Sequence, residues 1–432
     1  MACTKIFSGD FPEIISDIIQ YFQYDSSTLY SCILVNRLWC RSAIPLLWEN
    51  PFLLQYPKNY RYIEVYLYNL NDDYKTQLNE YGINNDLFPS NTLFNYPSFI
   101  QHLDTRRIGD SIEKWVAAVT VKEQSIVSEI VDHESLRYTK MIYKSLFRLF
   151  IENEANIHTF KFTMLVDNDL EYFKEIFELI LQNQNLLRNI KNLTLCFEPI
   201  TENITKFMKY LYSNCNSVLS LYFLFPSSCN STTERHFSRM IDSQKNLKKV
   251  YFSYNCNFSL YHSLLSLKNP NYDLNDDINM TLHLIENINH HLNYLTIESY
   301  ELSSIILQNL GQVLPPKLEY LNLILTINKR DFEIFIKNFQ NTYTKKLLIS
   351  NVRDETREKE EEKNILPYIK EYIMKKKRAE YFAFQECFTQ SFNHDDLFSM
   401  EDEVKEFKLY NIIVQNYNDL NIVIHEFINE MY

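Results

Sequence analysis

Glycine is almost absent from this chain of 432 residues, which contains only Gly9, Gly82, Gly109 and Gly311. A loop that cradles phosphate needs closely spaced glycines, because its backbone amides must approach the anion. The wide spacing of these four glycines therefore excludes a P-loop, the dinucleotide-binding fingerprint and the nucleophile elbow of a hydrolase.

Paired cysteines and long apolar runs are missing as well. The eight cysteines form no Cys-x-x-Cys pair, which argues against a zinc ribbon or a RING-type site. The longest uncharged run, residues 210–233, is interrupted by Pro226 and by polar residues, and no basic-then-apolar signal stands at the start of the sequence. We therefore expect a cytoplasmic or nuclear protein with reduced thiols.

Positive charge is in deficit. The chain has 43 Lys and Arg residues against 55 Asp and Glu residues, which gives a formal net charge of -12. Such a field does not attract nucleic acid, and no polybasic segment indicates a membrane surface. With 46% hydrophobic and 23% charged residues the composition is that of a folded protein, and the length predicts several domains or a repeat solenoid.

The first fifty residues predict three short helices. Pro12 suits the first turn of a helix, Asp25 and Asn36 are good N-cap residues for the second and third, and Pro45 is expected to end the third. The first helix carries apolar residues at helical spacing: Ile14, Ile15, Ile18, Ile19 and Phe22. A unit this small rarely buries enough apolar surface to be stable alone, so we expect it to need a neighbour or a partner.

The order of these residues resembles the F-box motif. In that family a Leu-Pro pair opens the first helix, a Leu-Val-Cys-Arg-x-Trp signature follows, and a Leu-Trp pair closes the unit. This chain has Phe11-Pro12, the sequence LVNRLW at residues 34–39 and Leu47-Trp48 at the matching positions. The resemblance covers residues 8–50, and Phe11 and Asn36 depart from the pattern.

F-box helices pack against the Skp-type adaptor of a cullin-based ubiquitin ligase, so the resemblance implies an adaptor-binding face. From the apolar positions of the motif we predict that this face comprises Phe11, Pro12, Ile14, Ile15, Ile18, Leu29, Leu34 and Val35. We further predict that Trp39 and Trp48 are structural and join the helical unit to itself and to the solenoid. The alternative is a helical cap on a larger domain, which uses the same residues as core.

A short template, apolar-x-x-apolar-x-apolar, recurs behind this unit. It begins at Ile157, Ile190, Val218, Leu247, Leu292 and Leu318, with a weaker copy at Thr344. Helical patterns lie between the copies, at 170–183, 202–212, 233–242 and 329–340. One strand and one helix per repeat resembles a leucine-rich-repeat solenoid with parallel strands, in which the longest step hides an insertion or a degenerate repeat near 280–287. The alternative is a non-repeating α/β domain.

These patterns predict an α/β protein with four parts. Residues 1–50 form the F-box, 51–150 an irregular adapter, 151–352 the leucine-rich-repeat-like solenoid, and 353–432 a charged loop with C-terminal capping repeats. Within the adapter we expect a strand at 112–120 and a helix at 134–153.

The solenoid also predicts a binding surface, because side chains alternate along each strand. The apolar template positions point inward, so the residues between them should face solvent in two columns. One column runs through Lys161, Thr194, Tyr222, Tyr251, Thr296 and Asn322, and its neighbour through Thr159, Asn192, Ser220, Lys249, Tyr294 and Tyr320. From these columns we predict a target-binding patch of four tyrosines and one lysine: Tyr222, Lys249, Tyr251, Tyr294 and Tyr320.

No residue pattern predicts an enzyme. Cys387 and His394 are seven positions apart, but catalytic Cys–His partners are usually distant in sequence, so a buried thiol and a surface imidazole are the simpler interpretation. We assign no catalytic residue, cofactor or metal. The predicted function is a substrate receptor of a Skp–cullin–F-box ubiquitin ligase, which binds the adaptor and a protein target but neither nucleic acid nor a membrane. The alternative is a repeat scaffold for protein–protein interaction without ligase association.

Overall fold

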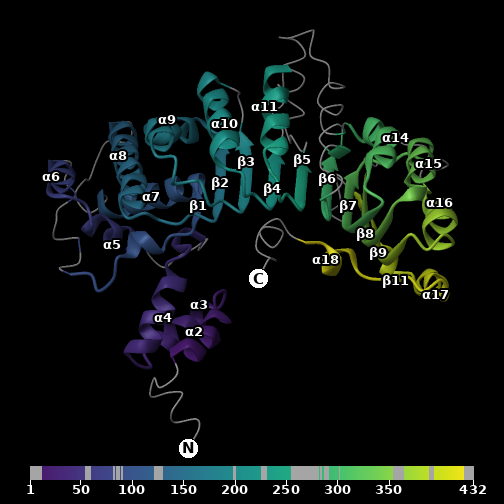
Figure 1. The fold of residues 1–432 in the computed structure, drawn as a ribbon, viewed down its shortest axis with the longest axis horizontal. Coiled ribbons are helices and arrows are strands. Elements are labelled where there is room, and N and C mark those ends of the chain that lie inside the picture. Colours follow the sequence, from purple (N-terminus) through teal and green to yellow (C-terminus); the bar gives the residue numbers. More distant parts are fainter. Residues whose placement is uncertain are drawn as a thin grey trace, which may run out of the picture. The chain divides into compact units, whose positions relative to one another are not determined.

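The computed structural model describes most of the chain (Figure 1). The described residues are 12–53, 60–80, 83, 88, 91–120, 130–197, 201–224, 231–253, 282, 285–286, 291–300, 302–353, 364–388 and 394–422. Two compact units make up the chain, Met1–Ile190 and Lys191–Tyr432. The boundary between them does not coincide with the divisions expected at residues 50, 150 and 352.

The first unit is mainly helical. Its longer elements are α2 (Pro12–Gln20), α3 (Ser26–Ile33), α4 (Arg37–Leu47), α5 (Tyr62–Tyr68), α6 (Asp72–Glu80), α7 (Thr105–Thr120), α8 (Ile130–Glu152) and α9 (Asp167–Gln182). Two short strands, β1 (His102–Asp104) and β2 (Thr159–Met164), pair in parallel, and the 3-10 turns η1 (Pro51–Leu53) and η3 (Tyr96–Phe99) lie in the connections.

Side-chain caps start the first helices where the sequence predicts them. Asp25 accepts a hydrogen bond from the amide of Thr28, and the side chain of Asn36 accepts from the amides of Leu38 and Trp39. Pro45, however, does not end α4, which runs on to Leu47. It lies two residues before the end of the helix, so the expectation that it ends the helix is wrong by two residues.

The segment 51–150 contains more helix than its pattern predicts. The strand expected at 112–120 is wrong, because these residues form the second half of α7. Ile108, Ile112, Trp115 and Val116 are buried at helical spacing, which fixes one face of α7 against the unit. The helix expected at 134–153 is confirmed as α8.

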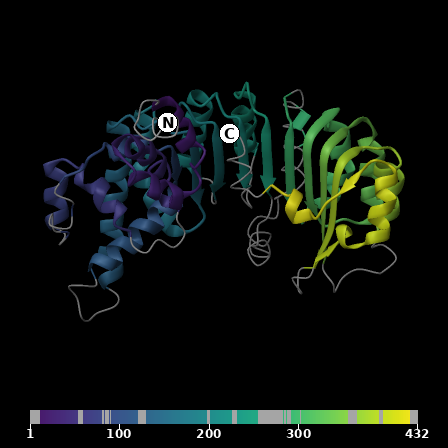
Figure 2. The ribbon, with the colours of Figure 1, turned by 90° about the horizontal axis from the view of Figure 1, so that it is seen from below.

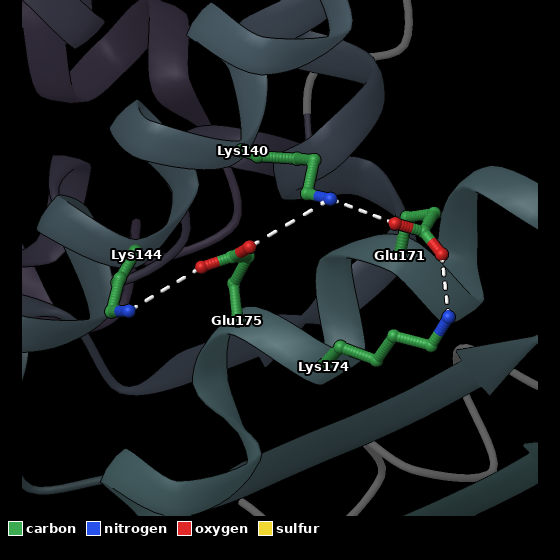
Figure 3. Close-up of polar contacts among 5 residues, drawn as sticks. All are labelled: Lys140, Lys144, Glu171, Lys174 and Glu175. Carbon is green, nitrogen blue, oxygen red and sulfur yellow. Dashed lines mark hydrogen bonds and ion pairs between the residues drawn. The ribbon is translucent and has the colours of Figure 1, made fainter.

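Helices α8 and α9 are joined by charged and aromatic contacts. Lys140 binds Glu171 at 2.7 Å and Glu175 at 3.7 Å, while Lys144 and Lys174 complete the network shown in Figure 3. Hydrogen bonds from the two flanking lysines lower the pKa of Glu171 to about 2. Because these side chains are partly exposed, each pair contributes little, and the packing depends more on buried rings such as Tyr143 and Tyr172, whose centroids lie 5.1 Å apart.

The second unit is a mixed α/β structure built on a mostly parallel sheet (Figures 1 and 2). Its parallel strands follow sequence order: β3 (Asn192–Phe197), β4 (Ser220–Leu224), β5 (Lys249–Ser253), β6 (Tyr294–Ser299), β7 (Lys317–Leu325), β8 (Tyr343–Arg353) and β9 (Ala379–Phe388). Two short strands then join β9: β10 (His394–Asp396) is antiparallel and β11 (Ile413–Val414) is parallel. The predicted α/β class and the parallel strands are confirmed.

Helices connect these strands. They are α10 (Glu202–Asn214), α11 (Ser231–Asp242), α14 (Ser303–Val313), α15 (Lys329–Asn338), α16 (Leu366–Tyr368), α17 (Glu401–Leu409) and α18 (Tyr417–Leu420), with 3-10 turns η4 (Phe339–Asn341) and η7 (Leu397–Ser399) and a π-helix, η6 (Ile369–Met374). The helices expected at 202–212, 233–242 and 329–340 are confirmed as α10, α11 and α15. The segment expected near 280–287 lies mostly outside the described residues, but β5 pairs directly with β6.

Strand register gives the sheet two different faces. Leu193, Leu221, Val250, Leu295 and Leu321 align across β3 to β7 on the helix face, where Phe223 packs on Phe237 of α11 with a ring-centroid distance of 4.8 Å. Thr194, Tyr222, Tyr251, Thr296 and Asn322 align on the opposite side, which we call the tail face. The two predicted columns are therefore confirmed as aligned positions from β3 to β7.

Replacing Gly311 with alanine tests the close approach between α14 and α15. In an exposed helix this change raises stability by about 1 kcal/mol. At Gly311 the added Cβ would lie 2.8 Å from the carbonyl oxygen of Phe335 and 2.9 Å from Cβ of Asn338. We expect Gly311→Ala to lower the free energy of unfolding by about 1–3 kcal/mol, measured by urea denaturation. Gln312→Ala, at an exposed position of the same helix, is the control, and a stability gain for Gly311→Ala would contradict this packing.

Candidate functional site

Helices α2, α3 and α4 enclose a small core of their own. Its buried side chains are Ile15, Ile19, Leu29, Cys32, Trp39 and Ala43. Phe22, Ile33, Leu38, Leu46 and Leu47 pack around them and are partly buried. Helices α3 and α4 therefore bury the apolar side chains on one side of α2.

Two of the predicted adaptor contacts belong to this core. The prediction that Ile15 and Leu29 contact an adaptor is wrong for this structure, because both side chains are fully enclosed between the three helices. Ile15 lies about 100° around the helix from Ile14, so neighbouring isoleucines face opposite environments. Phe11 lies outside the described residues.

The opposite side of α2 presents apolar side chains to solvent. Ile14 is 46% exposed and Ile18 is 37% exposed, and Tyr21 continues the same i, i+4, i+7 row. Leu34, which is 86% exposed, and Val35 occupy the turn between α3 and α4. Of the sixteen exposed large hydrophobic side chains in the described part of the chain, seven fall between residues 14 and 35, so exposure of this kind is concentrated here.

Trp48 and Glu49 attach the three helices to the rest of the first unit. The Trp48 ring lies 5.3 Å from Tyr66 and 4.3 Å from Tyr96, measured between centroids. The carbonyl oxygen of Glu49 accepts hydrogen bonds from the amides of Gln101 and His102. Trp39, in contrast, lies in the core of α2, α3 and α4.

A second candidate surface is the tail face of the second unit. The chain leaves β11, forms the single turn of α18, and runs across the strands on the side opposite α10, α11 and α14 (Figures 1 and 2). We call residues Tyr417–Ile422 the tail segment. The amide of Tyr417 donates to the Asp396 carboxylate at 2.8 Å, which fixes the start of this segment beside β10.

Hydrogen bonds join the tail segment to β7. The Tyr417 hydroxyl donates to Oδ1 of Asn322 at 2.8 Å, and Nδ2 of Asn322 donates to Oδ1 of Asn421 at 3.1 Å. The Tyr320 hydroxyl donates to the same Asn421 oxygen at 3.3 Å and accepts from the amide of Ile422 at 3.2 Å. Tyr320 and Asn322 thus bind both the side chain of Asn421 and the backbone beside it.

The predicted tyrosine patch is mostly buried. The prediction that Tyr222, Lys249, Tyr251 and Tyr320 face solvent is wrong, and Tyr294 is partly buried. Apolar packing explains the burial, since one cluster on the tail face combines these strand positions with the tail segment: Cys196, Tyr222, Tyr251, Tyr320, Leu348, Ala383, Tyr417, Leu420 and Ile422.

Specific contacts order the buried patch. Tyr222 and Tyr251 have ring centroids 4.8 Å apart, and the Lys249 ammonium lies 4.8 Å from the centroid of Tyr294. The Tyr251 hydroxyl donates to the Glu298 carboxylate at 2.9 Å. Burial raises the pKa of Tyr222 and of Tyr251, so both hydroxyls stay protonated.

Sequence reasoning missed the residues that organise this face. Asn322 stands in a predicted column but is not among the predicted binding residues, and no sequence pattern points to Tyr417, Asn421 or Glu298. A polar residue in an otherwise apolar strand was the available signal for Asn322. Nothing in the sequence near Tyr417 indicates that it meets a strand about 95 residues earlier.

Cys387 does not have the surroundings of a nucleophile. β10 pairs with β9 so that His394 stands opposite Cys387, but the Cys387 sulfur lies 3.3 Å from the Ser350 hydroxyl. Burial raises the pKa of the Cys387 thiol, which disfavours the reactive thiolate.

No protein-family model matches the chain, and no curated protein matches it either. Within the described ranges, no helix combines the length and the apolar character that crossing a bilayer requires.

On α2, Ile15 lies in the core and its neighbour Ile14 is exposed, so substitutions at the two positions test the orientation of the helix. We expect Ile15→Ala to reduce the stability of the helical unit by about 2–5 kcal/mol, because it empties a fully buried position. Ile14→Ala should change it by less than about 0.5 kcal/mol. Hydrogen exchange of the α2, α3 and α4 amides measures this local stability. Similar effects of the two substitutions would show that α2 is not oriented as described.

Proposed function

We propose that this protein is a substrate-receptor subunit of a Skp–cullin–F-box ubiquitin ligase. The observation that carries the proposal is the concentration of exposed apolar side chains on α2 and in the turn after α3. These side chains are available because the helical unit already has a complete core of its own.

Exposed apolar side chains gathered in one small region mark a protein-interaction site. Pro12, Ile14, Ile18, Leu34 and Val35 are exposed, and they are also positions at which the sequence follows the F-box pattern. Fully burying an isoleucine or leucine contributes about 1.5–3 kcal/mol. Several such residues together can offset the entropy lost on association. A Skp-type adaptor is the partner that this pattern implies.

The second unit supports the receptor half of the proposal. A helix follows each of the parallel strands β3, β4, β6 and β7, and this alternation is similar to that of a leucine-rich-repeat solenoid, which uses its strand face to bind a protein target. In this role the chain carries no catalytic residues. It brings the target close to the ubiquitin-transferring subunits, and proximity is its contribution to the reaction.

Charge placed on the exposed apolar side chains tests the adaptor site. We expect Ile18→Asp combined with Leu34→Asp to weaken binding of a purified Skp-type adaptor at least tenfold, since a carboxylate would be buried in an apolar contact. Leu409→Asp is the matched control, because Leu409 is 80% exposed but lies on α17. Isothermal titration calorimetry gives the affinities, and hydrogen exchange checks that α2, α3 and α4 stay folded.

Two outcomes would contradict the proposal. Undiminished adaptor binding by the double variant would place the docking site elsewhere. Failure of the wild-type chain to bind any Skp-type adaptor would favour the alternative, a scaffold that works without a ligase.

A further inference from the structure

The tail segment is held on the strand face in the manner of a bound peptide. Two strand side chains, Tyr320 and Asn322, make four hydrogen bonds that join it to β7. The bonds reach a side-chain amide, a tyrosine hydroxyl and one backbone amide. The residues that these hydrogen bonds join are 95–102 positions apart in sequence, so the contact does not result from local folding.

The apolar core under the helices is separate from the cluster that the tail segment completes on the tail face. That core lies on the helix face, where α11 and α17 cover rings such as Phe223 and Phe382. The tail face instead carries many polar side chains, among them Thr194, Thr296, Asn322, Ser350 and Gln385. Water can solvate these polar groups when the tail segment leaves, but apolar side chains of the same face, such as Tyr222 and Leu348, favour a ligand that covers them again.

The tail segment itself has little internal structure. Its helix, α18, spans only Tyr417–Leu420, and one turn of helix is not stable alone in water. It keeps its place through the strand contacts and the Asp396 anchor. A segment of this kind exchanges with the solvent-exposed state more readily than the strands beneath it.

Polar atoms beyond the tail segment are still unpaired. Oγ1 of Thr194 on β3 and Oγ of Ser220 on β4 are buried and have no hydrogen-bond partner among the described residues. Both belong to the two columns of the tail face. Such groups usually find a partner, so they indicate that this face can bind more peptide than residues 417–422 supply.

We propose that the strand face around Tyr320 and Asn322 is a peptide-binding site that the tail segment occupies as an internal ligand. The external ligand is an extended peptide of the same chemistry: a tyrosine, an asparagine four positions later, and an aliphatic residue directly after the asparagine. This ligand displaces residues 417–422. The identification of this external peptide with the ligase target rests on the proposed function, whereas the existence of the peptide site does not.

The contacts favour a peptide over other ligands. The Ile422 amide bound by Tyr320 is a backbone group that every peptide repeats. The Glu298 carboxylate, bound by Tyr251 and Ser253, stands on the same side of the sheet and would repel phosphate. The specificity of the site comes from Asn421, whose side-chain oxygen accepts hydrogen bonds from Tyr320 and Asn322.

The test uses the full-length chain and a fluorescent peptide copied from residues 413–422, IVQNYNDLNI. The chain's own tail competes at a high effective concentration, so the wild-type chain should bind the peptide weakly. Asn421→Ala removes the oxygen that accepts two hydrogen bonds, which should release the tail and raise peptide affinity at least tenfold in fluorescence anisotropy. Asn418→Ala is the matched control, because Asn418 is exposed, and it should behave as the wild type.

A second variant tests the site rather than the tail. Adding Tyr320→Phe to the Asn421→Ala chain deletes one hydroxyl and should reduce peptide affinity at least tenfold. A peptide in which alanine replaces the asparagine at the position of Asn421 should bind the Asn421→Ala chain equally poorly.

Hydrogen exchange supplies an independent measurement on the wild-type chain. Excess peptide should accelerate exchange of the chain's own residues 417–422 if it displaces them. No displacement, or equal peptide affinity for wild type and Asn421→Ala, would overturn the proposal and make the tail segment a permanent part of the fold. Adaptor binding, measured in parallel, separates the two proposals. If the wild-type chain binds no Skp-type adaptor, the ligase role is refuted, whereas the peptide site is unaffected.

Discussion

One register runs through the strands from β3 to β9, and it decides which side chains meet on each face of the sheet. Leu193, Leu221 and Val250 align toward the helices, while Thr194, Tyr222 and Tyr251 align on the other side. A slip of one residue in any strand would exchange the two sets. The apolar core and the face that holds the tail segment therefore depend on the same alternation.

The strands could be predicted because their apolar positions repeat at fixed intervals. The template beginning at Val218 and the one beginning at Leu247 each lead into a strand, and the aligned columns followed from alternation alone. β1 has only three residues, too few to show a pattern. β9 carries the template at Ala379, Phe382 and Phe384, in register with the copy that begins at Thr344, but alanine is a weak apolar signal at its first position. The end of α7 was mistaken for a strand because its valines and threonine favour strands in isolation, whereas the buried row beginning at Ile108 only emerges over the whole helix.

The candidate sites were harder to predict than the fold. Amphipathic spacing identifies α2 but does not say which isoleucine meets α3 and α4, so Ile15 and Ile14 are equivalent in sequence and opposite in structure. The strand columns were located correctly, yet their exposure was not, because a segment from the far end of the second unit covers them. Contacts such as that between Asn322 and Tyr417 depend on tertiary structure and leave no mark in local sequence.

The way β9 ends the sheet affects how the protein behaves at high concentration. A long terminal strand normally offers a row of unpaired backbone groups on which another chain can add a strand, the first step of many aggregates. Here β11 pairs with residues 381–382 of β9, and β10 pairs with residues 385–387. The two short strands, one parallel and one antiparallel, divide the outer edge between them. The stretches of β9 that neither short strand pairs are too short to template a new strand. This end of the sheet is therefore protected against self-association by its own chain.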